Sequence, residues 1–254
     1  MAPRRLKTVL KATAPARLAG KGARRGFEVV RQGQRTGQRL RGLTKALTKA
    51  IWSDGALPSC ALYGEVRRGG WKGRGGGRRR GAAVDAQVSR AVNSGKIKPA
   101  CGQYTLTKLT LAALAEHGLE PVACQRAVCS LRRRIGTAID VLCYERSSAR
   151  LIVVELKCGH SGGKTAPAQR DGAACAMRVP LTKACDSTLH RHMAQLACTR
   201  ELFAREAGTL KQLAAIGINP DVGGALLYVD DAATELYTLS DWWISKAGRI
   251  LAAL

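Results

Sequence analysis

The first 80 residues of this 254-residue chain contain very little acid. They hold 21 Lys/Arg and only 3 Asp/Glu, and residues 1–53 have a single acidic residue, Glu28. This segment therefore carries +18 of the formal net charge of +24. A segment with so little negative charge is suited to binding polyanions, of which nucleic acid is the usual one.

The chain also lacks long apolar runs and spaced cysteine pairs. No apolar run reaches the length that spans a bilayer, so we expect no membrane-spanning helix. The nine Cys are scattered singly without a Cys-x-x-Cys, and His190 and His192 have no nearby Cys at zinc spacing. Single thiols inside apolar patterns indicate a reduced, intracellular protein, and no secretory signal is visible.

Three interpretations of residues 1–53 remain open on composition alone: a mitochondrial transit peptide, a nuclear import signal, or a basic arm on nucleic acid. We expect a nuclear rather than a mitochondrial location. Within the segment, Leu6, Val9 and Leu10 line one face of a short basic helix. Arg39–Ile51 has the spacing of a second amphipathic helix.

Gly69–Gly81 is a low-complexity segment with the sequence GGWKGRGGGRRRG. Glycine gives it no fixed backbone, while Trp71 and the basic residues favour base stacking and phosphate binding. A flexible basic linker is the simpler interpretation. We predict a domain boundary here, with a basic, largely flexible extension over residues 1–80 and one domain over residues 81–254. The candidate nucleic-acid-binding residues in it are Arg78, Arg79 and Arg80.

The most informative stretch is Gly136–Gly159. Two apolar runs rich in β-branched residues flank the polar segment Glu145–Arg150, which predicts two strands joined by a tight turn. If the turn is centred between Ser147 and Ser148, Asp140 lies opposite Glu155, and Lys157 shares a face with Glu155.

Opposed carboxylates repel each other, and in an apolar hairpin they are costly. A divalent cation between them removes this cost, because hard cations take carboxylate and carbonyl oxygens. The alternative is that Asp140 and Glu155 lie at solvated strand ends, with Lys157 paired to Glu155. The register and the apolar run before Glu155 favour a metal site.

Further elements surround this hairpin. Ala82–Val92 and Tyr104–His117 have helical patterns, and the helix dipole explains Asp85 in the first turn of the former. Glu120–Cys129 reads as a strand, so that a helix pair precedes three antiparallel strands. Arg132, Arg133 and Arg134 follow it and form either a phosphate-binding group or a solvated turn. Later patterns predict a helix over Thr182–Ala207, strands at Gly224–Asp230 and Glu235–Leu239, and a last helix over Asp241–Leu254.

Gly136-x-x-Ile139-Asp140, followed by an apolar run ending in Glu155-Leu156-Lys157, resembles the PD-(D/E)xK nuclease superfamily, in particular its RecB-like and λ-exonuclease-like branches. The resemblance covers the element order of residues 81–254 and none of the N-terminal region. It implies an α/β (α+β sandwich) fold with a restriction-endonuclease-like core, in which helices flank a central mixed β-sheet, here with a basic N-terminal extension.

The resemblance also implies site residues. Asp140, Glu155 and the backbone carbonyl of Leu156 would hold Mg²⁺ or Mn²⁺, with Lys157 as the catalytic lysine. Asp85 matches an additional acid near the metal. His192-Met-Ala-Gln195-Leu196 is similar to a His-x-x-Gln-Leu helix of RecB-like nucleases, although Thr199 stands where a Tyr is often found. Residues that would contact nucleic acid are His192, Gln195 and Gln169.

We therefore expect a Mg²⁺-dependent nuclease that hydrolyses phosphodiester bonds, with DNA as the expected polymer and RNA as the alternative. The competing hypothesis is a non-catalytic nucleic-acid-binding protein that uses its basic N-terminus on a vestigial nuclease fold. A basic structural protein of a ribosome or virion fits less well, because the C-terminal two-thirds are apolar and organised.

Overall fold

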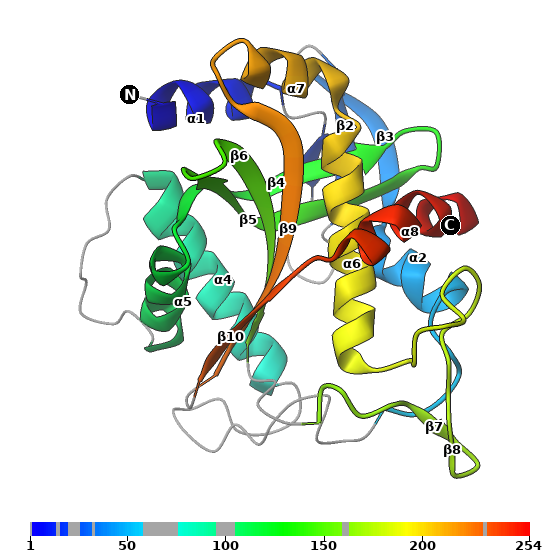
Figure 1. Ribbon diagram of the computed structural model, residues 1–254. Helices are drawn as coiled ribbons and strands as arrows, with labels where there is room; N and C mark the ends of the chain where they lie inside the picture. The colour runs from blue at the N-terminus through cyan, green and yellow to red at the C-terminus, as the bar shows by residue number, and fades with distance from the viewer. Residues whose placement is uncertain are drawn as a thin grey trace.

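A mixed β-sheet organises the computed structural model, and helices cover both of its faces (Figure 1). The structure describes residues 2–13, 16–19, 26–31, 34–57, 76–94, 105–158, 163–230 and 233–254. None of the helices in these ranges is long and apolar enough to cross a membrane. The strands are β1 (Ala16–Ala19), β2 (Gly26–Arg31), β3 (Gln34–Gly42), β4 (Leu119–Ser130), β5 (Ile135–Glu145), β6 (Arg150–Cys158), β7 (Gln169–Arg170), β8 (Ala173–Ala174), β9 (Asn219–Val229) and β10 (Thr234–Thr238).

The helices divide between two cores. One face of the sheet packs against α4 and α5, and the larger core on the other face includes residues of α1, α2, α6, α7 and α8. Apolar side chains at helical spacing explain this packing, since Val84, Val88 and Val92 are all buried on α4. The helices are α1 (Ala2–Ala12), α2 (Leu43–Ala50), α4 (Gly76–Ser94), α5 (Thr105–Glu116), α6 (Thr188–Ala204), α7 (Ala207–Ala214) and α8 (Asp241–Ala253).

The central hairpin has the predicted register. β5 and β6 are antiparallel, and Val141 pairs with Val154 while Glu145 pairs with Arg150. At the turn, Arg150 Nε donates to Glu145 Oε2 at 2.8 Å. β6 then continues through α6 and α7 to β9, with which it is parallel. The prediction of three antiparallel strands is confirmed, because β4 pairs with the other edge of β5 along its length.

Several predicted helix boundaries need correction. α6 begins at Thr188 rather than Thr182, because Ser187 caps it and accepts a hydrogen bond from the His190 N–H. α2 begins at Leu43 rather than Arg39, because the preceding residues belong to β3. α4 begins at Gly76, so Asp85 lies in its middle and the helix-dipole explanation for this residue is wrong.

The N-terminal region is not separate from the rest where the structure describes it. Leu6 and Leu10 of α1, and Leu43 and Leu47 of α2, are buried in the same core as the central hairpin. The expectation of a largely flexible extension over residues 1–80 is therefore wrong for these parts, whose apolar faces complete the larger core. Most of Gly69–Gly81 lies outside the described residues, as does the Arg78 side chain, and the last part of the segment begins α4.

β5 has one edge that two different strands share. Near its start, β3 pairs with it in parallel at Ile135 and Gly136. Near its end, β6 pairs with it from Val141 onwards. Between Gly136 and Val141, neither β3 nor β6 pairs with this edge of β5. We call the point where β6 separates from β5 the fork, and Asp140 lies there.

Candidate active site

The fork brings the two predicted carboxyl groups together. The last ladder pair of the hairpin joins Val141 and Val154, so Asp140 and Glu155 form the next opposed positions. Asp140 Oδ2 accepts a hydrogen bond of 3.0 Å from the Leu156 N–H. A side chain thus binds a backbone donor just past the end of the β5–β6 ladder. Because the N–H and C=O of one strand residue point to the same edge, the Leu156 carbonyl also faces β5.

Glu155 is buried and has two side-chain donors. It is 2% exposed, and its Oε1 accepts from Lys157 Nζ and from Gln195 Nε2, each at 2.5 Å. Gln195 lies on α6, the helix that crosses between β6 and β9. The predicted approach of Gln195 to the hairpin is therefore present, as a direct contact with Glu155.

Burial and electrostatic interactions shift the pKa values of Asp140, Glu155 and Lys157. Burial first, and then the charge of Asp140, raise the pKa of Glu155 to about 7, against the opposing effect of Lys157. Burial also raises the pKa of Asp140, although Lys157 and the Leu156 N–H act in the other direction. Burial alone would lower the pKa of Lys157, but the two carboxylates outweigh it and raise the pKa. The two acids thus resist ionising together, and the Lys157 ammonium group offsets part of this cost.

This shift predicts a pH dependence of stability. Glu155 has a folded-state pKa near 7, above its ordinary value of 4.5, so it binds a proton more tightly in the folded state. Its contribution to the free energy of unfolding is present below about pH 4.5 and is lost as the pH rises through about 7. We expect urea unfolding of metal-free protein between pH 5 and 8 to show this loss. A Glu155→Gln variant should have a flatter profile, and parallel profiles would contradict the assignment.

Gln125 is a site residue that the sequence analysis missed. Its Nε2 donates to Asp85 Oδ1 at 2.8 Å and lies 3.5 Å from Asp140 Oδ1. Gln125 has a φ of 53°, a left-handed conformation that interrupts β4 opposite Asp140. The β4–β5 register, with Cys124 opposite Val141, would have identified it. Gln125 thus connects Asp85 of α4 to the site. The negative charge of Asp85 makes a further small contribution to the raised pKa of Glu155.

A polar cluster extends from the site along α6 and β9. His192 lies one turn before Gln195, and its Nδ1 is 2.9 Å from the Tyr228 hydroxyl. The Lys164 ammonium lies 5.0 Å from the centre of the Tyr228 ring and pairs with Glu235 at 2.5 Å. Burial raises the pKa of Tyr228, with smaller contributions from Tyr237, Glu235 and Glu155. His192 thus lies beside the site and bonds to β9.

Other predicted residues lie elsewhere. Arg132, Arg133 and Arg134 form the turn before β5, about 20 Å along the strand from Asp140 at about 3.3 Å per residue. Gln169 is exposed on the small β7–β8 hairpin, outside the central sheet. Arg80 of α4 is mostly buried, and its charge acts on the Cys158 thiol next to Lys157.

The donor set fits a hard divalent cation. Asp140 and Glu155 supply carboxylate oxygens, and the Leu156 carbonyl faces the same edge. In the part of the chain that the structure describes, no group of three or more His, Cys, Asp or Glu side chains is arranged to hold a metal. Two carboxylates and one carbonyl are oxygen ligands of the kind that Mg²⁺ takes, and Mg²⁺ usually keeps several waters beside one or two carboxylates.

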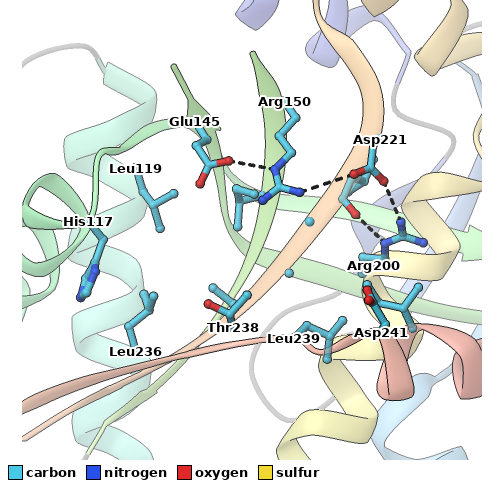
Figure 2. A pocket seen from close by; sticks show the side chains of 16 residues that line it. His117, Leu119, Glu145, Arg150, Arg200, Asp221, Leu236, Thr238, Leu239 and Asp241 are labelled. Atoms are coloured by element: carbon cyan, nitrogen blue, oxygen red, sulfur yellow. Dashed lines mark hydrogen bonds and ion pairs between the residues drawn. The ribbon is translucent and has the colours of Figure 1, made fainter. Parts of the chain in front are cut away.

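A separate pocket of about 500 Å³ opens where β6 and β9 begin and where α8 starts (Figure 2). Asp221 lies between Arg150 and Arg200, at 3.4 Å from each, and Arg150 also pairs with Glu145 (Figure 2). Arg200 Nε donates to the Val222 carbonyl. Both guanidinium groups thus have acidic partners, so this pocket has no excess charge to attract a phosphate.

Comparison with known proteins adds no family assignment. No protein-family model matches the chain, and no curated protein matches its sequence significantly.

Proposed function

We propose that this protein is a metal-dependent nuclease with a restriction-endonuclease-like core, as the resemblance to the PD-(D/E)xK superfamily implies. The observation that carries the proposal is the meeting of Asp140 and Glu155 at the β5–β6 fork, with Lys157 Nζ at 2.5 Å from Glu155. The sequence of elements around it, two helices, three antiparallel strands, a crossover helix and a parallel strand, supports the proposal.

Each residue has a definite role in this proposal. Asp140, Glu155 and the Leu156 carbonyl would hold Mg²⁺ or Mn²⁺. The ion would supply a water of lowered pKa and stabilise charge on the phosphoryl oxygens. Gln195 donates to Glu155 Oε1 and so restrains the orientation of the Glu155 carboxylate.

Lys157 acts as a cation in this scheme. Because the neighbouring carboxylates raise its pKa, its ammonium group is protonated at neutral pH. A protonated amine donates hydrogen bonds and does not accept a proton. Lys157 therefore binds a non-bridging phosphate oxygen and positions the scissile group for in-line attack by water, whose proton passes to solvent. The phosphorus–oxygen bond to the leaving nucleotide breaks as the new bond to water forms, and the leaving oxygen takes a proton from solvent.

The test compares wild type with Lys157→Ala on labelled DNA and RNA, in Mg²⁺ and in EDTA. We expect degradation only in Mg²⁺, and a loss of about 10² to 10³-fold in the variant, the usual effect of removing one group that stabilises the transition state. Lys211→Ala, on the exposed side of α7, is the matched control and should keep full activity. Equal degradation by wild type and Lys157→Ala would remove the site from consideration.

One observation favours a second function. Lys157 and Gln195 already satisfy Glu155 Oε1 without an ion. A Glu155 carboxylate whose Oε1 is hydrogen-bonded by two side chains is compatible with a protein that binds nucleic acid and does not cleave it. Salt-dependent binding without metal-dependent cleavage would select this alternative.

A further inference from the structure

Five arginines lie at one corner of the molecule, near the N-terminal start of β5, and the fork lies further along the same strand. We name them the arginine corner: Arg41 of β3, Arg132, Arg133 and Arg134 of the β4–β5 turn, and Arg249 of α8. Backbone pairing of β3 with β5 joins the first two elements, since the Arg41 N–H donates to the Arg134 carbonyl at 2.8 Å. Figure 1 shows β3 and the C-terminal end of α8 on the same side of the molecule.

Two of these arginines hold α8 against the corner. Arg41 Nη2 donates to the main-chain oxygen of Leu254 at 2.6 Å, and Arg133 Nη1 donates to the Ala252 carbonyl at 3.0 Å. Arg249 lies three residues before Ala252 and hence on the same face of the helix. The remaining three arginines, Arg132, Arg134 and Arg249, are exposed.

The corner has a large excess of positive charge. β3, α2, the β4–β5 turn and the last two turns of α8 contain no acidic residue. Three other solvent-accessible arginines have acidic partners, in the pairs Arg146–Glu120, Arg178–Asp54 and Arg205–Glu201. Five guanidinium groups on segments that contain no acidic side chain make a strong electrostatic site for an anionic polymer.

We infer that the arginine corner binds the sugar-phosphate backbone of nucleic acid, as a second contact remote from the fork. Arginine presents a planar set of donors that matches phosphate oxygens. The distance of about 20 Å from Asp140 corresponds to about six steps of a duplex strand, at about 3.4 Å per step. The corner and the fork would therefore engage one duplex at two places. This second part of the inference depends on the proposed nuclease function, whereas phosphate binding by the corner does not.

A membrane surface is a poorer partner. Of the large apolar side chains exposed in the described residues, only Leu131 belongs to this turn, and it is 41% exposed. An interfacial segment needs a broad apolar face beside its cations. Nucleic acid needs only the cations.

The binding experiment uses Arg132→Gln/Arg134→Gln/Arg249→Gln, which leaves the two arginines that hold α8. Its matched control is Arg146→Gln/Arg178→Gln/Arg205→Gln. Affinity for a 30-base-pair duplex is measured by fluorescence anisotropy in EDTA over a range of NaCl concentrations. We expect the corner variant to lose roughly tenfold to hundredfold in affinity at 0.1 M salt, and its salt slope to fall by about three, since each phosphate contact contributes about 0.9. The control should match wild type.

Three outcomes would overturn the inference. The first is equal affinity of the corner variant and its control. The second is an unchanged salt slope. The third is stronger binding of wild type to anionic lipid vesicles than to duplex, lost in the corner variant, which would make the corner a membrane contact. Thermal unfolding of each variant shows whether the fold is intact.

Duplex length separates this inference from the proposed nuclease function. If both places are engaged, wild type should bind a hairpin of about 12 base pairs more tightly than one of about 4, which is too short to reach from the corner to the fork at about 3.4 Å per step, and the corner substitutions should reduce this gain. Equal loss on both hairpins would overturn the two-place arrangement. Failure to cleave in Mg²⁺, with the anisotropy result as expected, would reject the nuclease function and leave the corner as a nucleic-acid contact.

Discussion

Replacing Asp140 by Asn is expected to lower metal-dependent cleavage by about 10³-fold or more, equivalent to about 4 kcal/mol of transition-state stabilisation. The amide keeps an oxygen that can accept the Leu156 N–H, so the end of β6 should stay in place. What is lost is the negative charge that holds the cation. Initial rates of cleavage of labelled DNA in Mg²⁺ measure the effect.

Asp221→Asn is the control for this prediction. Asp221 is also a strand aspartate, and it lies between Arg150 and Arg200 in the separate pocket rather than at the fork. We expect it to retain cleavage within about twofold, because surface substitutions away from special features have small effects. If Asp140→Asn cleaves as fast as Asp221→Asn, Asp140 is not a metal ligand.

The largest expected effect on stability is that of Asp186→Ala. Asp186 is completely buried and accepts two hydrogen bonds from Arg191 and two from the N–H and hydroxyl of Ser53. Its loss leaves a guanidinium group without its counter-charge inside the protein. Breaking one partner of a buried pair costs about 3–5 kcal/mol. A loss of this size should lower the melting temperature by roughly 6–20 °C in a chain of this length.

An exposed ion pair provides the comparison for Asp186. Arg178 and Asp54 are 2.5 Å apart, and the Asp54 side chain is 72% exposed. Asp54→Ala should therefore cost less than about 1 kcal/mol, because water screens the pair. Calorimetry of both variants tests the difference. Similar melting temperatures for the two would contradict a structural role for the buried carboxylate.

The central hairpin could be predicted because local chemistry determines it. Alternating apolar residues fix which side of each strand is buried, and the short polar turn fixes which residues are opposed. Asp140 and Glu155 followed from this register. The approach of Gln195 did not; it depends on how α6 crosses the sheet, and only the resemblance of the helix motif suggested it.

The N-terminal strands could not be predicted, because distant contacts rather than local chemistry determine them. β3 has the sequence QRTGQRLRG, in which only Leu40 gives an apolar signal. Its place in the sheet comes from pairing with β2 and with the start of β5, which involves residues nearly 100 positions apart. The start of α4 was missed because its Gly and Arg residues have the composition of a linker, whereas packing of the later valines stabilises the helix.

The hydrogen bond from the Leu156 amide to Asp140 makes the contact between β5 and β6 at the fork sensitive to charge. Elsewhere in a sheet, main-chain groups hold neighbouring strands together irrespective of charge. At this one point, the strength of the tie between β5 and β6 varies with whether a carboxyl group is ionised. Binding of an ion or a proton at Asp140 therefore changes the strength of a hydrogen bond to the backbone of β6, the strand that bears Glu155 and Lys157.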